Sequence, residues 1–240
     1  MSKFWLSERM VSRVFWEELK SSIFYEEASK DARKIAEITS PKVAEFPAEA
    51  GSISITSSIY LWLLSKYFSP KSVLEIGTYI GRSTLALAFG GKDSITEFYT
   101  CDGTFDCLDF NLLDLTGLES VKQNAVNRIQ YFGKTMSTSL LQELKGKGVK
   151  LDLVFIDGRI SNDDCKILSE VMSDTCVLVL DDFEGVEKGI VNAMMLRNNF
   201  RAMFLVSPAV EENRIAGNLA LLLPAGLLTL TRQQGLPVNM

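Results

Sequence analysis

The chain has 240 residues, of which 47% are apolar and 23% charged, so a packed globular core is expected and disorder is not. Its 25 basic and 30 acidic residues give a formal net charge of -5, which provides no basic face for a phosphate backbone, so nucleic acid is not expected as a partner. The absence of histidine excludes Ser-His-Asp and Cys-His mechanisms and every His-ligated metal site. Chemistry must then use carboxylates, Lys, Arg, Tyr, Cys or hydroxyl groups, or a cofactor that is already reactive.

Three features of the sequence bear on location. The four cysteines include no CxxC pair, and free buried thiols in a reducing cytosol are the expected state. Lys3, Glu8 and Arg9 interrupt the early apolar stretch, so no secretory signal is expected. The longest uncharged segments, 50–65 and 215–231, contain polar residues and fall short of the ~20 apolar residues that span a membrane. The sequence predicts a cytoplasmic protein with no membrane partner.

The first part of the chain has helical patterns. Ser7 is a suitable N-cap, and apolar residues recur at helical spacing to about residue 38. Pro41 and Pro47 mark a connector before a second apolar helix over about 54–67. We therefore expect a helical cap over residues 1–66. Its aromatic first helix should pack in the core or in a homo-oligomer interface, rather than line a substrate pocket.

From residue 72 onward, short apolar strands alternate with helical patterns. Strands are expected over 73–76, 97–101, 129–132, 153–156 and 176–180, with helices over 83–89, 118–127, 140–144 and 163–172. Nearly all-apolar strands joined by helical crossovers predict a parallel sheet covered on both faces. A further helix near 186–198 precedes strands 202–206 and 218–223, which should pair antiparallel because only a polar loop joins them. One α/β domain is expected over residues 67–240.

The end of the first strand has the features of a ligand site. The buried strand runs into Gly77 and Gly81, and the next helix carries Ser83 in its first turn. Glycines let a ligand approach the backbone, and a helix N-terminus offers free N–H groups to an anion. Asp102 lies 21 residues after Gly81, where doubly wound folds place an acid that accepts hydrogen bonds from ribose. The pattern favours a cofactor site over a mere tight turn.

Phosphate-binding loops fit this segment poorly. A Walker loop has four residues between its glycines followed by Lys, whereas three residues separate Gly77 from Gly81 and Arg82 follows. A dinucleotide loop needs glycine where Thr78 or Tyr79 stands, because a side chain there would crowd a pyrophosphate. A ligand with a carboxylate in place of phosphates fits better.

At these residues the chain resembles the class I S-adenosylmethionine-dependent methyltransferases, and among them the catechol-type and macrocin-type small-molecule O-methyltransferases. The run from Glu75 to Ser83 is similar to their loop Glu-x-Gly-x-Tyr-x-Gly-x-Ser. The resemblance implies a Rossmann-like methyltransferase fold with a mostly parallel seven-stranded sheet, an antiparallel last strand and an N-terminal helical cap. It also implies S-adenosylmethionine as the cofactor.

The resemblance further assigns residues to parts of the cofactor. The methionine end would lie among Gly77, Tyr79 and Ser83 of a loop that also contains Glu75 and Gly81, with Ser83 at the carboxylate. Asp102 would bind the ribose. Ser137 and Thr138, in the loop after the third strand, would lie near the adenine.

A second constellation consists of acids at the ends of the fourth and fifth strands. Asp157 follows one buried strand and the pair Asp181 and Asp182 follows the next; adjacent strand ends lie about 5 Å apart, so the three should meet. Close carboxylates repel unless a cation or protons compensate, and oxygen ligands favour Mg²⁺ or Ca²⁺ over zinc. By resemblance to metal-dependent O-methyltransferases, all three are expected metal ligands, with Mg²⁺ as a second cofactor. Alternatively, Asp157 is a cofactor-side or capping residue and the Asp pair caps the next helix.

The general base of the related families is missing from this chain. Arg159 stands where macrocin-type enzymes often have Asp, and Ile160 where catechol-type enzymes have Lys. A bound metal would still lower the pKa of a substrate hydroxyl. The catalytic candidates are therefore Asp157 and Arg159, the latter for binding an acidic substrate. We expect methyl transfer to a small-molecule hydroxyl; the alternatives are a cyclisation or elimination at the same cofactor site, and a non-catalytic cofactor-binding subunit.

Overall fold

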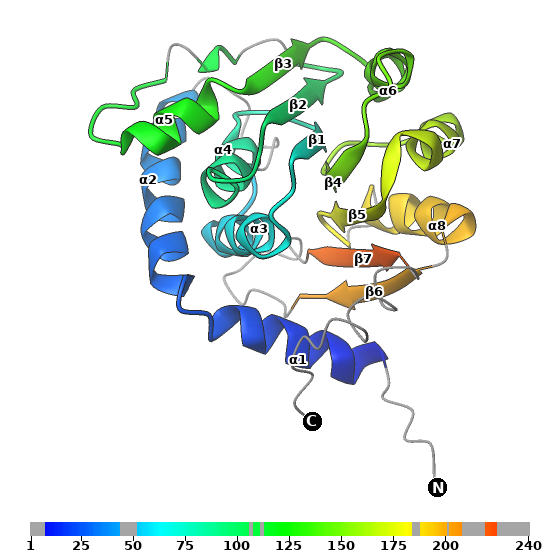
Figure 1. Cartoon of the computed structure of the whole chain (residues 1–240), viewed down its shortest axis with the longest axis horizontal. Helices are drawn as coiled ribbons and strands as arrows, with labels where there is room; N and C mark the ends of the chain where they lie inside the picture. The colour runs from blue at the N-terminus through cyan, green and yellow to red at the C-terminus, as the bar shows by residue number, and fades with distance from the viewer. Residues whose placement is uncertain are drawn as a thin grey trace, which may run out of the picture.

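A seven-stranded sheet lies at the centre of the molecule, with helices on both of its faces (Figure 1). The computed structural model describes residues 8–43, 52–105, 108–110, 113–183, 188–200, 202–207 and 219–224. In chain order the strands are β1 Ser72–Ile76, β2 Glu97–Asp102, β3 Ile129–Gly133, β4 Leu151–Ile156, β5 Met172–Leu180, β6 Ala202–Val206 and β7 Ala220–Pro224.

The strand order is β3-β2-β1-β4-β5-β7-β6, and only β7 runs against the others. The first five strands pair parallel, whereas β7 pairs antiparallel with both β5 and β6. Ile76 lies opposite Ile156, which lies opposite Leu180, so β1, β4 and β5 end at the same edge of the sheet. The expected fold class, including the antiparallel last strand, is confirmed.

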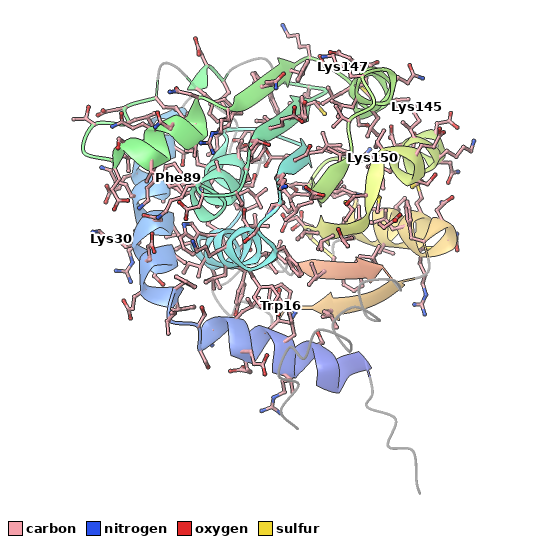
Figure 2. The ribbon with its side chains drawn as sticks, in the orientation of Figure 1. Trp16, Lys30, Phe89, Lys145, Lys147 and Lys150 are labelled. Carbon is pink, nitrogen blue, oxygen red and sulfur yellow. The ribbon has the colours of Figure 1, made fainter. Side chains whose placement is uncertain are left out.

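Both faces of the sheet are buried. Helices α3 Ile55–Phe68, α4 Arg82–Gly90 and α5 Ser120–Val126 cover one face, and α6 Ser137–Gly146, α7 Asn162–Val171 and α8 Gly189–Asn199 cover the other (Figure 1). Alternate strand residues enter different cores. Val73 and Leu153 join the cluster that includes Phe89 of α4, which is labelled in Figure 2. Leu74 and Val154 join the opposite cluster. Apolar side chains are therefore required at nearly every strand position.

The N-terminal part contains two helices in place of the one expected over residues 7 to about 38. They are α1 Glu8–Lys20 and α2 Tyr25–Val43. The break lies at Ser22, whose hydroxyl oxygen accepts a hydrogen bond from the Phe24 amide and whose carbonyl accepts one from the Tyr25 amide. Serine competes in this way with helical hydrogen bonding, which explains why the helix ends there.

Helix α1 packs on β6, the outermost strand of the sheet (Figures 1 and 2). The Ser12 hydroxyl donates to the Val206 carbonyl at 2.8 Å, and the buried Trp16 indole donates to the Leu205 carbonyl at 3.2 Å. The Trp16 ring also lies 5.0 Å from that of Tyr60 in α3. The Trp16 side chain thus belongs to the core of its own chain.

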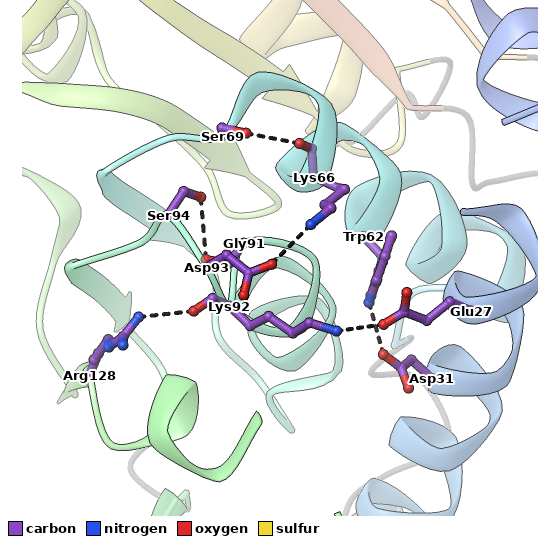
Figure 3. A network of polar contacts seen from close by, with 10 residues as sticks. All are labelled: Glu27, Asp31, Trp62, Lys66, Ser69, Gly91, Lys92, Asp93, Ser94 and Arg128. Atoms are coloured by element: carbon purple, nitrogen blue, oxygen red, sulfur yellow. Dashed lines mark hydrogen bonds and ion pairs between the residues drawn. The ribbon is translucent and has the colours of Figure 1, made fainter. Parts of the chain in front are cut away.

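Polar contacts fix α2 to the rest of the molecule (Figure 3). The buried carboxylate of Asp31 accepts hydrogen bonds from the Trp62 indole at 3.0 Å and from the Lys122 ammonium at 2.7 Å. Glu27, one turn earlier, pairs with Lys92 at 2.5 Å.

A division into residues 1–66 and 67–240 remains a prediction. None of the helices in the described ranges combines the length and the apolar character that crossing a membrane requires.

Candidate active site

The turn between β1 and α4 is built on left-handed backbone conformations. Gly77 has φ 101°, Tyr79 has φ 45° and Gly81, the N-cap of α4, has φ 79°. A Cβ atom on Gly77 would lie 2.7 Å from the amide nitrogen of Gly158, after β4. The loop after β4 thus requires glycine at position 77. A larger residue at position 77, such as the valine of Gly77→Val, would collide with the backbone at Asp157 and Gly158.

Residues 108–110 pack over the start of α4. Leu108 and Phe110 are buried, and a Cβ atom on Gly81 would lie 2.7 Å from the Leu108 side chain. This part of the connection after β2 therefore covers the glycine turn with apolar groups.

Glu75 is the buried centre of a cluster of hydroxyl groups. Its carboxylate accepts hydrogen bonds from Ser83 at 2.5 Å, Thr84 at 2.5 Å and Thr100 at 2.6 Å. Burial raises the pKa of Glu75 to about 7, although the three hydroxyl donors oppose the rise. The Ser83 hydroxyl, assigned by resemblance to the cofactor carboxylate, donates to Glu75 here. The N–H groups of the first turn of α4 are the other donors for an anion at this point.

Asp102 joins the loops after β1 and β2. One carboxylate oxygen accepts from the Tyr79 amide, and the other accepts from the Thr104 and Phe105 amides, all at 2.9 Å. The rings of Tyr79 and Phe105 lie 5.4 Å apart. A carboxylate has about four acceptor sites, so these three bonds leave capacity for a ligand hydroxyl. The ribose contact remains a prediction.

Ser137 and Thr138 connect α6 to α7. Their hydroxyl groups lie 3.1 and 2.6 Å from the Asp164 carboxylate, and that carboxylate also accepts from the amide of Ser161, the N-cap of α7. Asp164 escaped the sequence reasoning, although Ser161-x-x-Asp164 resembles a capping box. The adenine contact of Ser137 and Thr138 remains a prediction.

The three acids at the ends of β4 and β5 meet as the sheet register requires. Carboxylate oxygens of Asp157, Asp181 and Asp182 all lie within 4.8 Å of one another. Burial raises the pKa values of Asp157 and Asp181, and nearby carboxylates reinforce the effect. Within the described part of the chain, Oδ1 of Asp181 makes no hydrogen bond. Arg159 is exposed beside this edge and pairs with no acid of the described residues.

A fourth charged group, Lys188, lies inside this cluster. Its ammonium forms an ion pair with Asp157, lies 3.2 Å from the Asp182 carboxylate and donates to the Asp157 carbonyl at 2.7 Å. Burial lowers the pKa of Lys188, but the charge of Asp157 outweighs it and raises the pKa above its ordinary value, so Lys188 is a cation at neutral pH. Lys188 was not identified from the sequence; its position beside a helix N-terminus, which is electrostatically unfavourable for a cation, was the one weak signal that an acidic partner is needed.

Mg²⁺ does not fit between these side chains as they stand. A divalent ion about 4 Å from the ammonium would be repelled by about 8 kcal/mol at an effective dielectric constant of about 20. The position between Asp157 and Asp182 is taken by Lys188. Metal binding would therefore require Lys188 to leave the cluster.

Comparison with known proteins identifies the central part of the chain. A family model described as a methyltransferase domain matches residues 74–183. The chain carries a methyltransferase domain. The match begins in β1 and ends just after Asp182, so it includes the glycine turn, Asp102 and the carboxylate cluster.

Solved structures of methyltransferases share the fold of this chain. An O-methyltransferase from Bacillus cereus, in complex with SAH, has a TM-score of 0.58 and 14% identity, covering 88% of this chain and 97% of that one. The O-methyltransferase TomG from Streptomyces achromogenes, in complex with SAM, has a TM-score of 0.54 and 16% identity, covering 91% and 99%. A methyltransferase from Geobacter sulfurreducens has a TM-score of 0.54 and 12% identity, covering 80% and 89%. No curated protein matches the chain in sequence.

Proposed function

We propose that the protein transfers the methyl group of S-adenosylmethionine to a hydroxyl oxygen of a small molecule. The observation that carries this proposal is the position of the glycine turn and Asp102 at the carboxyl edge of a methyltransferase domain. Ligands of open α/β sheets bind at this edge. TomG, which shares the fold, is an O-methyltransferase involved in tomaymycin synthesis, and this favours a small-molecule acceptor.

The residues present suit the cofactor. The open backbone of the glycine turn and the N-terminus of α4 would receive the methionine carboxylate, and the remaining acceptor capacity of Asp102 would receive the ribose. The residues around Ser137 and Thr138 would border the adenine. S-adenosylmethionine supplies a methyl group already activated by its sulfonium, so the protein mainly has to align donor and acceptor.

The acceptor would bind where β4 and β5 end, beside the carboxylate cluster. In the transfer, the new bond forms between the acceptor oxygen and the methyl carbon while the bond from that carbon to sulfur breaks. The hydroxyl proton leaves to a carboxylate or to water, and Asp157 is the proposed catalytic carboxylate at this edge. Arg159 is exposed nearby, and we propose it as the contact for an acidic group on the acceptor.

Two measurements test the function. Calorimetry with S-adenosylhomocysteine reports whether the cofactor site exists, and micromolar binding is expected. Transfer of a labelled methyl group from the cofactor to a small-molecule extract then reports the reaction. Binding without transfer would favour a cyclisation, an elimination or a non-catalytic cofactor-binding subunit. Absence of binding would refute the cofactor assignment.

A homo-oligomer formed through the N-terminal helices is a separate proposal. Val14 of α1 is 54% exposed, and Ile23, between α1 and α2, is 90% exposed. Light scattering on the purified protein tests it, and a monomeric mass at micromolar concentration would contradict it. A cytoplasmic location also remains a proposal.

A further inference from the structure

Lys188 is held at the carboxylate cluster by the packing of α8. One helical turn after it, the buried Asn192 donates to the Gly158 carbonyl at 2.8 Å and accepts from the Ile160 amide at 3.2 Å. Residues four apart lie on the same side of a helix, so Lys188 and Asn192 both face the loop after β4. Together they bind the Asp157 and Gly158 carbonyls, which fixes the start of α8 against this loop.

Gly189 brings the backbone of α8 close to Asp182, on the other side of the cluster. A Cβ atom at this position would lie 1.6 Å from the Asp182 carbonyl oxygen. Only a residue without a side chain permits this approach. Asp182 itself has φ 52°, a conformation that non-glycine residues rarely adopt. The backbone on both sides of the ion pairs is therefore specialised to keep Lys188 next to the acids.

We propose that the Lys188 ammonium is a built-in cation that takes the place of a divalent metal ion, so that the acceptor site operates without metal. The catalytic consequence rests on the proposed function, whereas the absence of metal binding can be tested whatever reaction the protein catalyses. Lys188 acts as a positioning residue. Its ammonium pairs with Asp157 and lies 3.2 Å from the Asp182 carboxylate, so it holds the two acids together and neutralises them as the expected metal ion would. Because the fixed cation already compensates part of the negative charge of the three acids, a bound metal ion is not needed to hold them together.

The first experiment uses the full chain, freed of metal with EDTA and titrated with Mn²⁺ and Mg²⁺ by calorimetry. No binding is expected up to millimolar concentration, and neither ion should change Tm. If labelled methyl transfer is found, excess EDTA should leave its rate unchanged. Saturable metal binding below about 1 mM, or a Tm increase that EDTA reverses, would overturn the proposal.

The second experiment removes the cation. K188M should acquire Mn²⁺ binding with a Kd below about 100 μM, which is at least tenfold tighter than the millimolar limit expected for the original chain, with a Tm increase of roughly 3–5 °C when the ion is at ten times its Kd. K188R keeps a cation and should remain unresponsive. K166M is the matched control, because Lys166 pairs with Asp163 at 2.7 Å on the exposed surface of α7. The gain should disappear in K188M/D181N, which removes one acid of the cluster.

A folded K188M that binds metal no better than the original chain would overturn the proposal, as would metal binding by K188R. Should K188M fail to fold, K188Q, with a shorter neutral side chain, serves for the same titration. S-adenosylhomocysteine binding is measured in parallel on every variant. The cofactor site lies at the ends of β1 and β2, apart from Lys188. If S-adenosylhomocysteine does not bind, the proposed function is refuted, but the metal titrations still decide the role of Lys188.

Discussion

The buried carboxyl group of Glu75 provides a quantitative test of the chemistry beneath the glycine turn. Its pKa is raised from 4.5 to about 7, mainly by burial. Between these values the folded chain holds a proton that the unfolded chain has lost, so the free energy of unfolding should fall as pH rises from about 4.5 to about 7 and level off above. The shift corresponds to about 3.5 kcal/mol, at about 1.4 kcal/mol for each pH unit.

Glu75→Gln isolates this contribution, because glutamine cannot ionise. Urea unfolding at pH 5, 6, 7 and 8 gives the free energy of unfolding of both proteins. Their difference should change by about 2.5 kcal/mol in favour of the variant between pH 5 and pH 8, because part of the full effect is already present at pH 5. Titrating groups that do not interact with Glu75 affect both proteins equally and cancel. Glu143→Gln, at an exposed pair with Lys147, is the control and should show no such change. A difference between Glu75→Gln and the original that stays constant from pH 5 to pH 8 would refute the reasoning.

Two further substitutions test the turns around the cofactor site. Asp102→Ala removes the acceptor of three loop amides and the proposed ribose contact, so it should lower the free energy of unfolding by about 2–4 kcal/mol and weaken S-adenosylhomocysteine binding by about 5- to 100-fold in calorimetry; unchanged affinity would remove the ribose assignment. Gly77→Ala should destabilise the protein in urea by more than about 1 kcal/mol beyond Gly117→Ala, since both positions have positive φ but nothing lies within 4 Å of a Cβ on Gly117. Equal losses in the two variants would show that backbone strain alone, and not the contact with the β4 loop, explains glycine at 77.

The strands and the carboxylate cluster could be predicted because both follow from periodic rules. Strands covered on both faces are apolar at most positions, and parallel strands end at one edge, which brings Asp157 to Asp181 and Asp182. The break at Ser22 was missed because a serine inside a helical pattern gives only a weak signal, and its competing hydrogen bonds are local.

Side-chain partners were harder to predict than backbone positions. Lys188 lies 31 residues after Asp157, on a helix whose approach depends on a glycine next to it, and no motif describes that contact. The Ser83 hydroxyl had two possible acceptors, a ligand or the strand beneath, and only the burial of Glu75 directs it to the strand. In both cases a buried ionisable group selects the partner.

The packing of α1 on β6 has a consequence for the solubility of shortened forms of the chain. β6 is the outermost strand of the sheet, and a bare outer strand attracts strands of other molecules, which leads to aggregation. Ser12 and Trp16 bind two of its carbonyl groups and lay a helix across it. A chain that begins after residue 24 would keep the whole methyltransferase domain but would expose this strand. It should therefore aggregate more readily, even where its cofactor site is intact.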